Sequence, residues 1–360
     1  MIDAVAEQIA ALKDEDWSIR GEAAGMLGTI KDPRAVGPLV SLLRDEDRSV
    51  REAAIEALRA IGTAAVETVG TCLTDPDLSI QESASAILVT IADERVLAPL
   101  IKALHSGDWI VRMHVAKALG RIRNADAVVP LIPLLQDKVK AVREEAAASL
   151  AAIGDAAIPS LLKTLQHEDW LVRLHAVESL GKAQSKRAVE PLLSVLFNDR
   201  DSAVREDAVR ALGEIGDPQA VEYLFTAMRE LGLRTLAVEA LGRIGDPRAV
   251  PVLIDVLSGT SPPQATRTMA GCGDQWNEEV MTQSAAARAL GAIGDEKAIP
   301  SLVAALSQTF TRAEAAAALA QFGSKVIPLL LPLLNEPRDE NLLFHVRETL
   351  ASAGWRPRRI

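Results

Sequence analysis

The sequence predicts an all-α protein, a right-handed α-solenoid of about eleven helix pairs that runs over residues 1–360 as one domain. A phrase of about 31 residues returns along the chain: an Asp-rich turn, V-R-x-x-A-x-x-A-L-x-x-I-G, and then D-P-x-A-V-x-P-L-I-x-x-L. Such a period is typical of helix pairs that bury their apolar faces by stacking on their neighbours. No run of residues resembles a strand.

The residue that opens the second helix of each pair sets the register. These residues are Arg20, Arg51, Gln81, Arg112, Arg143, Arg173, Arg205, Arg234, Gln283, Arg312 and Arg347. Their spacing is 29 to 32 residues, apart from one gap of 49 and a last gap of 35. We therefore expect one long insertion and a slightly stretched last repeat.

The turn between two pairs is defined by residues 215–221, I-G-D-P-Q-A-V. Gly216 follows the last apolar residue of a helix, where a left-handed conformation costs glycine least. Asp217 can cap the next helix, and Pro218 fits its first turn because no backbone donor is needed there. The phrase predicts where each pair ends and the next begins.

The second helix of each pair has its own start signal and its own apolar stripe. An aspartate stands four residues before the register residue in six repeats: Asp16, Asp47, Asp77, Asp108, Asp169 and Asp201. Each is a candidate N-cap. Ala54, Leu58 and Ile61 follow Arg51 at helical spacing and form one buried stripe. The recurrent Asp and Arg residues predict a polar ladder between repeats.

Composition and charge restrict the function classes. No run approaches the roughly 20 apolar residues of a membrane span, and residues 1–7 lack the pattern of a signal peptide. With only two cysteines in the chain, a disulfide framework is not expected, so the predicted location is the cytoplasm. Residues 1–100 hold 9 Lys+Arg and 18 Asp+Glu, which argues against a nucleic-acid groove. The short basic tail, residues 355–360, does not reverse this balance.

Two near-identical segments depart from the repeat consensus. They read G-D-W-I-V-R-M-H over residues 107–114 and E-D-W-L-V-R-L-H over residues 168–175, with a weaker copy at Trp17. Second helices usually line the concave face of a solenoid, so Trp109, His114, Trp170 and His175 are candidate partner-binding residues, because tryptophan is a favoured anchor. The alternative is that the tryptophans pack between repeats and the histidines are solvated. The separation of the two histidines does not suit a shared metal ion.

The long gap in the register falls at residues 258–281, which we expect to form a non-repeat loop. Pro262, Pro263 and three glycines argue against a continuous helix. Long loops on one face of a solenoid are often contact surfaces. Cys272 and Trp276 are therefore candidate contact residues, although a tolerated insertion without function explains the segment equally well. No neighbouring base supports a covalent role for Cys272.

Catalytic and cofactor signatures are otherwise absent from the sequence. It contains no P-loop, no G-x-S-x-G, no H-E-x-x-H and no C-x-x-C. Acidic pairs are abundant, but they stand in turns, where helix capping explains them. We therefore expect no catalytic residues, no metal and no cofactor.

The complete phrase, D-W-x-V-R-x-x-A-x-x-A-L-G-x-I-G-D-P-x-A-V-x-P-L-I-x-x-L, resembles the short HEAT-like repeat named after the phycobilisome lyases, over residues 3–354. Lyase subunits of this type attach a linear tetrapyrrole to a protein cysteine, usually as a pair of different subunits. Deoxyhypusine hydroxylase, a HEAT-like di-iron enzyme, takes its ligands from His-Glu dipeptides in repeated helices. Here the only such dipeptide is His167-Glu168, in a predicted turn. HEAT-like DNA glycosylases need a cationic groove, which the acidic N-terminal third does not favour.

The resemblance and the residues together favour a non-catalytic scaffold or adaptor, such as an assembly or maturation factor for a larger complex. Its partner would be a protein, and the acidic N-terminal third favours a basic partner surface. A phycobilin lyase subunit is the alternative, and a di-iron hydroxylase is a more remote one. Neither nucleic acid nor a membrane is expected as a partner.

Overall fold

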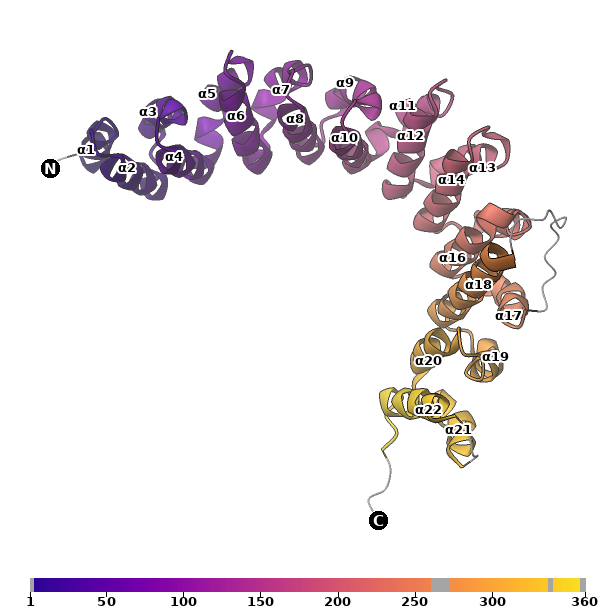
Figure 1. Ribbon diagram of the computed structural model, residues 1–360. Coiled ribbons are helices and arrows are strands. Elements are labelled where there is room, and N and C mark those ends of the chain that lie inside the picture. Colours follow the sequence, from indigo (N-terminus) through magenta and orange to yellow (C-terminus); the bar gives the residue numbers. More distant parts are fainter. Residues whose placement is uncertain (1–2, 260–271, 336–338, 357–360) are drawn as a thin grey trace. The chain divides into compact units, whose positions relative to one another are not determined.

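The computed structural model describes residues 3–259, 272–335 and 339–356, and within these ranges it contains helices and turns but no strand (Figure 1). Each repeat consists of a short odd-numbered helix followed by a longer even-numbered one. The odd-numbered helices are α1 (Ala4–Ala11), α3 (Val36–Ser41), α5 (Val66–Thr71), α7 (Leu97–Ala103), α9 (Val128–Leu131), α11 (Ile158–Thr164), α13 (Val189–Asn198), α15 (Val221–Ala227), α17 (Val250–Leu257), α19 (Ile299–Ala305) and α21 (Ile327–Leu330). The even-numbered helices are α2 (Trp17–Ile30), α4 (Arg48–Ile61), α6 (Leu78–Ile91), α8 (Trp109–Ile122), α10 (Lys140–Ile153), α12 (Trp170–Lys182), α14 (Ser202–Ile215), α16 (Arg234–Ile244), α18 (Cys272–Ile293), α20 (Arg312–Ala320) and α22 (Glu340–Ser352). The predicted all-α solenoid of helix pairs is thereby confirmed.

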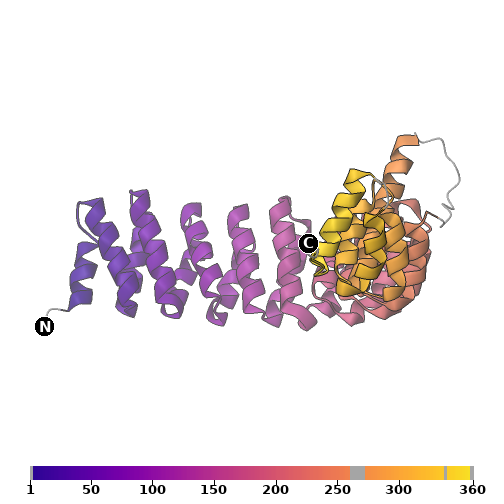
Figure 2. The same cartoon turned by 90° about the horizontal axis from the view of Figure 1, so that it is seen from below.

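The chain divides into two compact units, residues 1–179 and residues 180–360, where the sequence predicted one domain. Within each unit the odd-numbered helices form one layer and the even-numbered helices form the other (Figure 1). Seen from below, the even-numbered helices of the first unit lie side by side (Figure 2). The apolar core fills the space between the two layers, where Leu39 and Leu58 are fully buried.

The predicted caps are present at the helix ends. The carboxylate of Asp16 accepts a hydrogen bond of 2.8 Å from the Ser18 backbone N–H, and Asp217 accepts one of 2.9 Å from Gln219. Gly216 ends α14 with a φ of 70°. Where no glycine is available, Lys31 and Arg123 adopt the same left-handed conformation, which is strained for residues that carry a Cβ atom.

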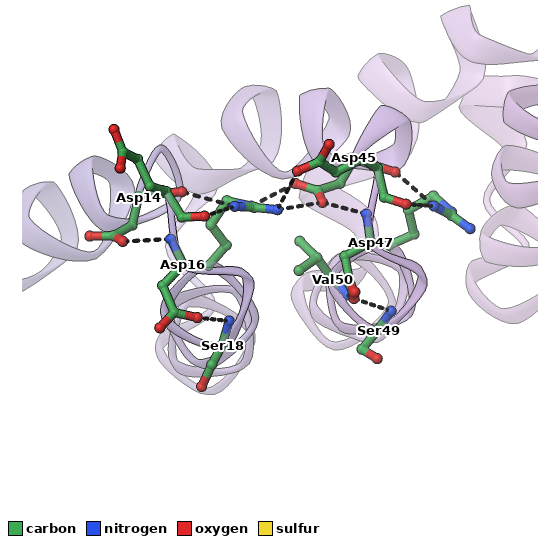
Figure 3. A network of polar contacts seen from close by, with 11 residues as sticks. Asp14, Asp16, Ser18, Asp45, Asp47, Ser49 and Val50 are labelled. Atoms are coloured by element: carbon green, nitrogen blue, oxygen red, sulfur yellow. Dashed lines mark hydrogen bonds and ion pairs between the residues drawn. The ribbon is translucent and has the colours of Figure 1, made fainter.

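The predicted polar ladder connects consecutive repeats in the first unit (Figure 3). Arg20 donates to both carboxylate oxygens of Asp45, at 2.8 and 2.9 Å, and to the carbonyl oxygens of residues 14 and 15. Arg112 repeats this arrangement with Asp137. Each of these two guanidinium groups therefore ties the turn that precedes its own helix to the turn of the next repeat, which confirms the predicted structural role for Arg20 and Arg112.

A row of glycines lets the even-numbered helices approach closely. A Cβ atom on Gly28 would lie 2.8 Å from the Cα atom of Ala57 in α4, and one on Gly213 would lie 2.9 Å from the Cα atom of Ala240 in α16. In the same register α4 carries Arg59 instead of glycine, and α4 and α6 approach each other less closely than α2 and α4. Glycine at this position therefore accompanies the close contact of α2 with α4, whereas Arg59 accompanies the looser contact of α4 with α6.

The last repeat has a different register from the one predicted from Arg347. Thr349 in α22 donates to the Ala316 carbonyl, as Ser149 in α10 donates to the Ala116 carbonyl, and both pairs are 33 residues apart. The residue equivalent to Arg312 is therefore Leu343, 31 residues further on. The prediction of a stretched last repeat with a gap of 35 residues was wrong. Arg347 lies one turn beyond the true register position and is exposed.

The predicted loop over residues 258–281 is shorter than expected. Helix α18 begins at Cys272, so residues 272–281 are helical, and Gly273 lies inside the helix. Residues 260–271 lie outside the described residues, as do residues 357–360 of the predicted basic tail. Within the described ranges, no helix combines the length and the apolar character needed to cross a membrane.

Candidate functional site

Three exposed tryptophans begin even-numbered helices of the first unit. Trp17, Trp109 and Trp170 are the first residues of α2, α8 and α12, and 53%, 42% and 45% of their surfaces are exposed. Each follows a capping aspartate, so the helix start fixes the backbone that carries the indole. We call these three residues the Trp edge. About half of each side chain is exposed and half is covered, so a contact role and the alternative role of packing between repeats both stay predictions.

The two histidines predicted beside the tryptophans do not share that surface. His175 is buried, with 6% of its surface exposed. Its Nδ1 atom lies 3.0 Å from a carboxylate oxygen of Glu178, and its Nε2 atom accepts a hydrogen bond of 3.4 Å from Arg143. The prediction of a partner-binding or solvated His175 was therefore wrong, because this side chain fills the space between α10 and α12.

His114 is half buried and faces α6. Its Nδ1 atom lies 3.2 Å from the hydroxyl oxygen of Ser85. Burial lowers the pKa of His114 below its ordinary value, and the positive charges of Lys117 and Arg59 lower it further. Burial and these charges therefore both favour the neutral form of the His114 imidazole.

Removing the charge of Lys117 tests this account of His114. We expect Lys117→Met to raise the pKa of His114 toward the ordinary value of about 6.5, because a repelling charge is lost. The measurement is a titration of the His114 imidazole by NMR. Lys102→Met, on α7, is the matched control and should leave the pKa of His114 unchanged. An unchanged pKa in Lys117→Met would contradict the electrostatic account.

The remaining predicted residues are less informative. Cys272 and Trp276 lie in the first turns of α18, but their side chains are outside the described residues. Cys72 is buried, which raises the pKa of its thiol. His167 stands in the turn before α12, where its Nδ1 atom accepts a hydrogen bond of 3.1 Å from the Asp169 backbone N–H. Among the residues that the structure describes, no group of three His, Cys, Asp or Glu side chains could hold a metal ion.

The structure also contains a groove that the sequence did not predict, between α8 and α10. Its volume is about 550 Å³, and we call it the basic groove. It is lined by Lys117, Gly120, Arg121, Arg123, Glu145, Ala148, Ser149 and Ala152. Gly120 and Ser149 form its floor at the close contact of the two helices. Three cations and one carboxylate line it, in contrast to the net negative charge of residues 1–100.

Comparison with known proteins places this architecture in a family. The sequence profile of HEAT repeats matches residues 5–88, 66–151, 97–169, 128–207, 158–230, 189–270 and 276–351. The karyopherin Kap121p has a similar fold, with a TM-score of 0.63 at 13% identity over 98% of this chain and 45% of that chain. At this identity the similarity concerns the fold alone.

Two groups of relatives are similar in sequence. Phycocyanobilin lyase subunit alpha of Nostoc sp. is 31% identical over 62% of this chain and 78% of the relative. Deoxyhypusine hydroxylase-B of Oryza sativa subsp. japonica is 29% identical over 60% of this chain and 72% of the relative. A second phycocyanobilin lyase subunit alpha, from Picosynechococcus sp., is 31% identical over 64% of this chain and 83% of the relative. The chain therefore belongs to the HEAT-repeat family and is homologous to phycocyanobilin lyase subunits of the phycobilisome-lyase repeat type and to deoxyhypusine hydroxylases.

Proposed function

We propose that this protein is a non-catalytic scaffold or adaptor that binds a protein partner through the first unit. The observation that carries the proposal is the Trp edge, because tryptophan side chains on a rigid backbone are frequent anchors at protein interfaces. Trp17, Trp109 and Trp170 each stand at the start of a capped helix, so little conformational entropy is lost when a partner covers them. An assembly or maturation factor for a larger complex is the role that best suits such a surface.

The charge beside the Trp edge favours a partner with a basic surface. Glu15 and Glu46 stand in the exposed turns that precede α2 and α4. The carboxylate of Glu46 is 90% exposed and only 3.9 Å from Arg20, so the ion pair leaves it largely available to solvent. A basic partner surface would approach this region faster than a neutral one.

A subunit of a phycobilin lyase is the second candidate, since two phycocyanobilin lyase subunits are 31% identical to this chain. A deoxyhypusine hydroxylase is more remote. The lone His167-Glu168 dipeptide stands in a turn, and His167 already accepts a backbone hydrogen bond there. A bilin absorption band or bound iron in the purified protein would identify the respective enzyme class.

An affinity pull-down from the native host tests the scaffold. The triple variant Trp17→Ala, Trp109→Ala, Trp170→Ala is expected to lose a specific protein partner that the unaltered chain retains, with a loss of about tenfold or more, because each anchor contributes about 1–2 kcal/mol. The matched control replaces three exposed apolar residues elsewhere: Val129→Ala, Tyr223→Ala and Leu329→Ala. It should retain the partner.

Mass spectrometry and an absorption spectrum of each eluate separate the outcomes. A colourless partner that is lost only in the Trp variant supports the scaffold. A partner retained equally by both variants removes the Trp edge from the interface. A bilin band in the eluate of the unaltered chain replaces the scaffold with the lyase.

A further inference from the structure

The basic groove contains cations that form no ion pair with any carboxylate of the described residues. Within the described residues, Lys117, Arg121 and Arg123 make no ion pair, although Arg20, Arg34, Arg44, Arg95 and Arg112 of the same unit each pair with an aspartate. Arg121 donates to the carbonyl oxygen of Val89 at 2.6 Å, which fixes its position without neutralising its charge. The groove is therefore a local positive site in the unit that also contains the acidic residues 1–100.

A second groove, between α16 and α18 in the other unit, provides an internal comparison. It has the same floor, formed by Gly242 and Ala289, and it is also lined by two arginines. There the charge is neutralised, because Arg288 lies 3.3 Å from Glu239 and Arg243 lies 4.0 Å from Glu214. Free cations are thus not a necessary result of two even-numbered helices meeting at a glycine.

Arg59 in α4 does not extend the positive site, because its Nη1 atom pairs with the carboxylate of Glu56 at 2.5 Å. Arg59 lies in the register position that glycine occupies in α8, and its Nε atom is buried without an acceptor among the described residues. The carbonyl oxygen of Ala86 in α6 is 3.5 Å from its Nη2 atom. Arg59 and Lys117 both lower the pKa of His114, but in the described structure Arg59 is paired with Glu56 whereas Lys117 forms no ion pair.

We propose that the basic groove binds an acidic peptide segment of the protein partner, with carboxylates paired to Lys117 and Arg123 and held beside the fixed guanidinium of Arg121. This inference rests on the proposed scaffold function and specifies a second contact for the same partner. Arginine pairs with carboxylates in a defined geometry, and the shallow floor of Gly120, Ser149 and Ala152 leaves room for a backbone.

A peptide suits the groove better than a nucleic acid. Binding of a nucleic acid depends on many phosphate contacts along a continuous basic surface. Here the positive site is short, and Glu145 already lies within it. The acidic turns of residues 1–100 lie in the same unit and would repel an extended polyanion.

Fluorescence anisotropy with a fluorescein-labelled decapeptide of glutamate tests the proposal. We expect the unaltered protein to bind this probe, and Lys117→Glu, Arg123→Glu to weaken binding by about tenfold or more. The control variant Lys102→Glu, Lys163→Glu changes the net charge equally at two exposed lysines of the odd-numbered layer. It should bind within about twofold of the unaltered protein. The uncharged variant Lys117→Gln, Arg123→Gln should also lose binding, which shows that repulsion by new carboxylates is not the cause.

Four results would overturn the inference. The first is that the unaltered protein does not bind the glutamate probe, and the second is that the control variant loses as much binding as Lys117→Glu, Arg123→Glu. The third is that the uncharged variant binds the probe fully. The fourth is that the protein binds a labelled DNA duplex more tightly than the probe and that the substitutions at Lys117 and Arg123 abolish this binding.

The pull-down separates this inference from the scaffold proposal. If the Trp variant loses the partner while the glutamate probe fails, the scaffold stands and the groove does not. If the Trp variant retains the partner, and only the variants at Lys117 and Arg123 lose the glutamate probe, the groove proposal stands and the Trp edge does not.

Discussion

Replacing Gly120 with alanine is expected to lower the free energy of unfolding by about 2 kcal/mol, since overpacking a closely packed contact costs about 1–3 kcal/mol. The new Cβ atom would lie 2.6 Å from the hydroxyl oxygen of Ser149 and 2.7 Å from its Cα atom. A rotamer change could move the hydroxyl, but the Cα atom moves only if α10 shifts as a whole. The substitution therefore separates α8 from α10 and disturbs the hydrogen bond from Ser149 to Ala116.

The same substitution at Gly25 should have the opposite sign. Gly25 also lies inside an even-numbered helix, but a Cβ atom there meets nothing within 4 Å. Alanine is favoured over glycine in a helix by about 0.5–1 kcal/mol, so Gly25→Ala should stabilise the protein. Urea denaturation followed by circular dichroism gives both changes, and hydrogen exchange of α8 and α10 shows where the first one acts. Equal effects at the two positions would refute the account of close packing.

The second large effect is expected at the polar ladder. Asp137→Asn should cost about 3 kcal/mol, as expected when one partner of a largely buried ion pair is removed. The side chains of Arg112 and Asp137 are only 16% and 11% exposed, so the guanidinium of Arg112 cannot turn to water. Asp126→Asn, an exposed acid without an ion pair in the described structure, is the matched control and should change stability by less than about 0.5 kcal/mol.

The pH dependence of the same variant provides an independent measurement. Burial alone would raise the pKa of Asp137, but hydrogen bonds from Arg112 and from the Val139 backbone N–H hold it below its ordinary value. A lowered pKa in the folded state contributes stability above about pH 3.9, the ordinary value, and this contribution is lost as the pH falls through the folded-state pKa. The difference in unfolding free energy between the unaltered protein and Asp137→Asn should therefore shrink as the pH falls below about 4. A difference that is independent of pH would show that the charge of Asp137 is not responsible.

The features that the sequence predicted well are those that one repeat specifies by itself. The capping aspartates, the left-handed Gly216 and the ladder arginines act within one turn or between adjacent turns. Their contacts can therefore be predicted from their spacing in the sequence. The register of the last repeat was missed because Val346-Arg347 imitates the V-R of the consensus. In the structure the cap at Asp339 and the small side chain at Thr349 determine that register.

The site was predicted less completely, because its properties depend on neighbouring repeats. His114 and His175 stand at the same place in the repeat, yet one is half buried against Ser85 and the other is enclosed by Arg143 and Glu178. A single repeat contains no information about the side chain that the next repeat presents. The basic groove was not predicted for a related reason. Its cations stand at different register positions, so a comparison of repeats does not group them, and they lie outside residues 1–100, whose charge was counted.

The presence of glycine at this position in some even-numbered helices and of larger residues in others also has a mechanical consequence. Where glycine allows a close backbone approach, as between α2 and α4, we expect neighbouring helices to resist bending, because a tilt would compress closely packed main-chain atoms. Between α4 and α6 the long side chain of Arg59 takes the place of that contact, and a flexible arginine deforms more easily than a backbone. We therefore expect the contact between α4 and α6 to deform more easily under load than the contact between α2 and α4.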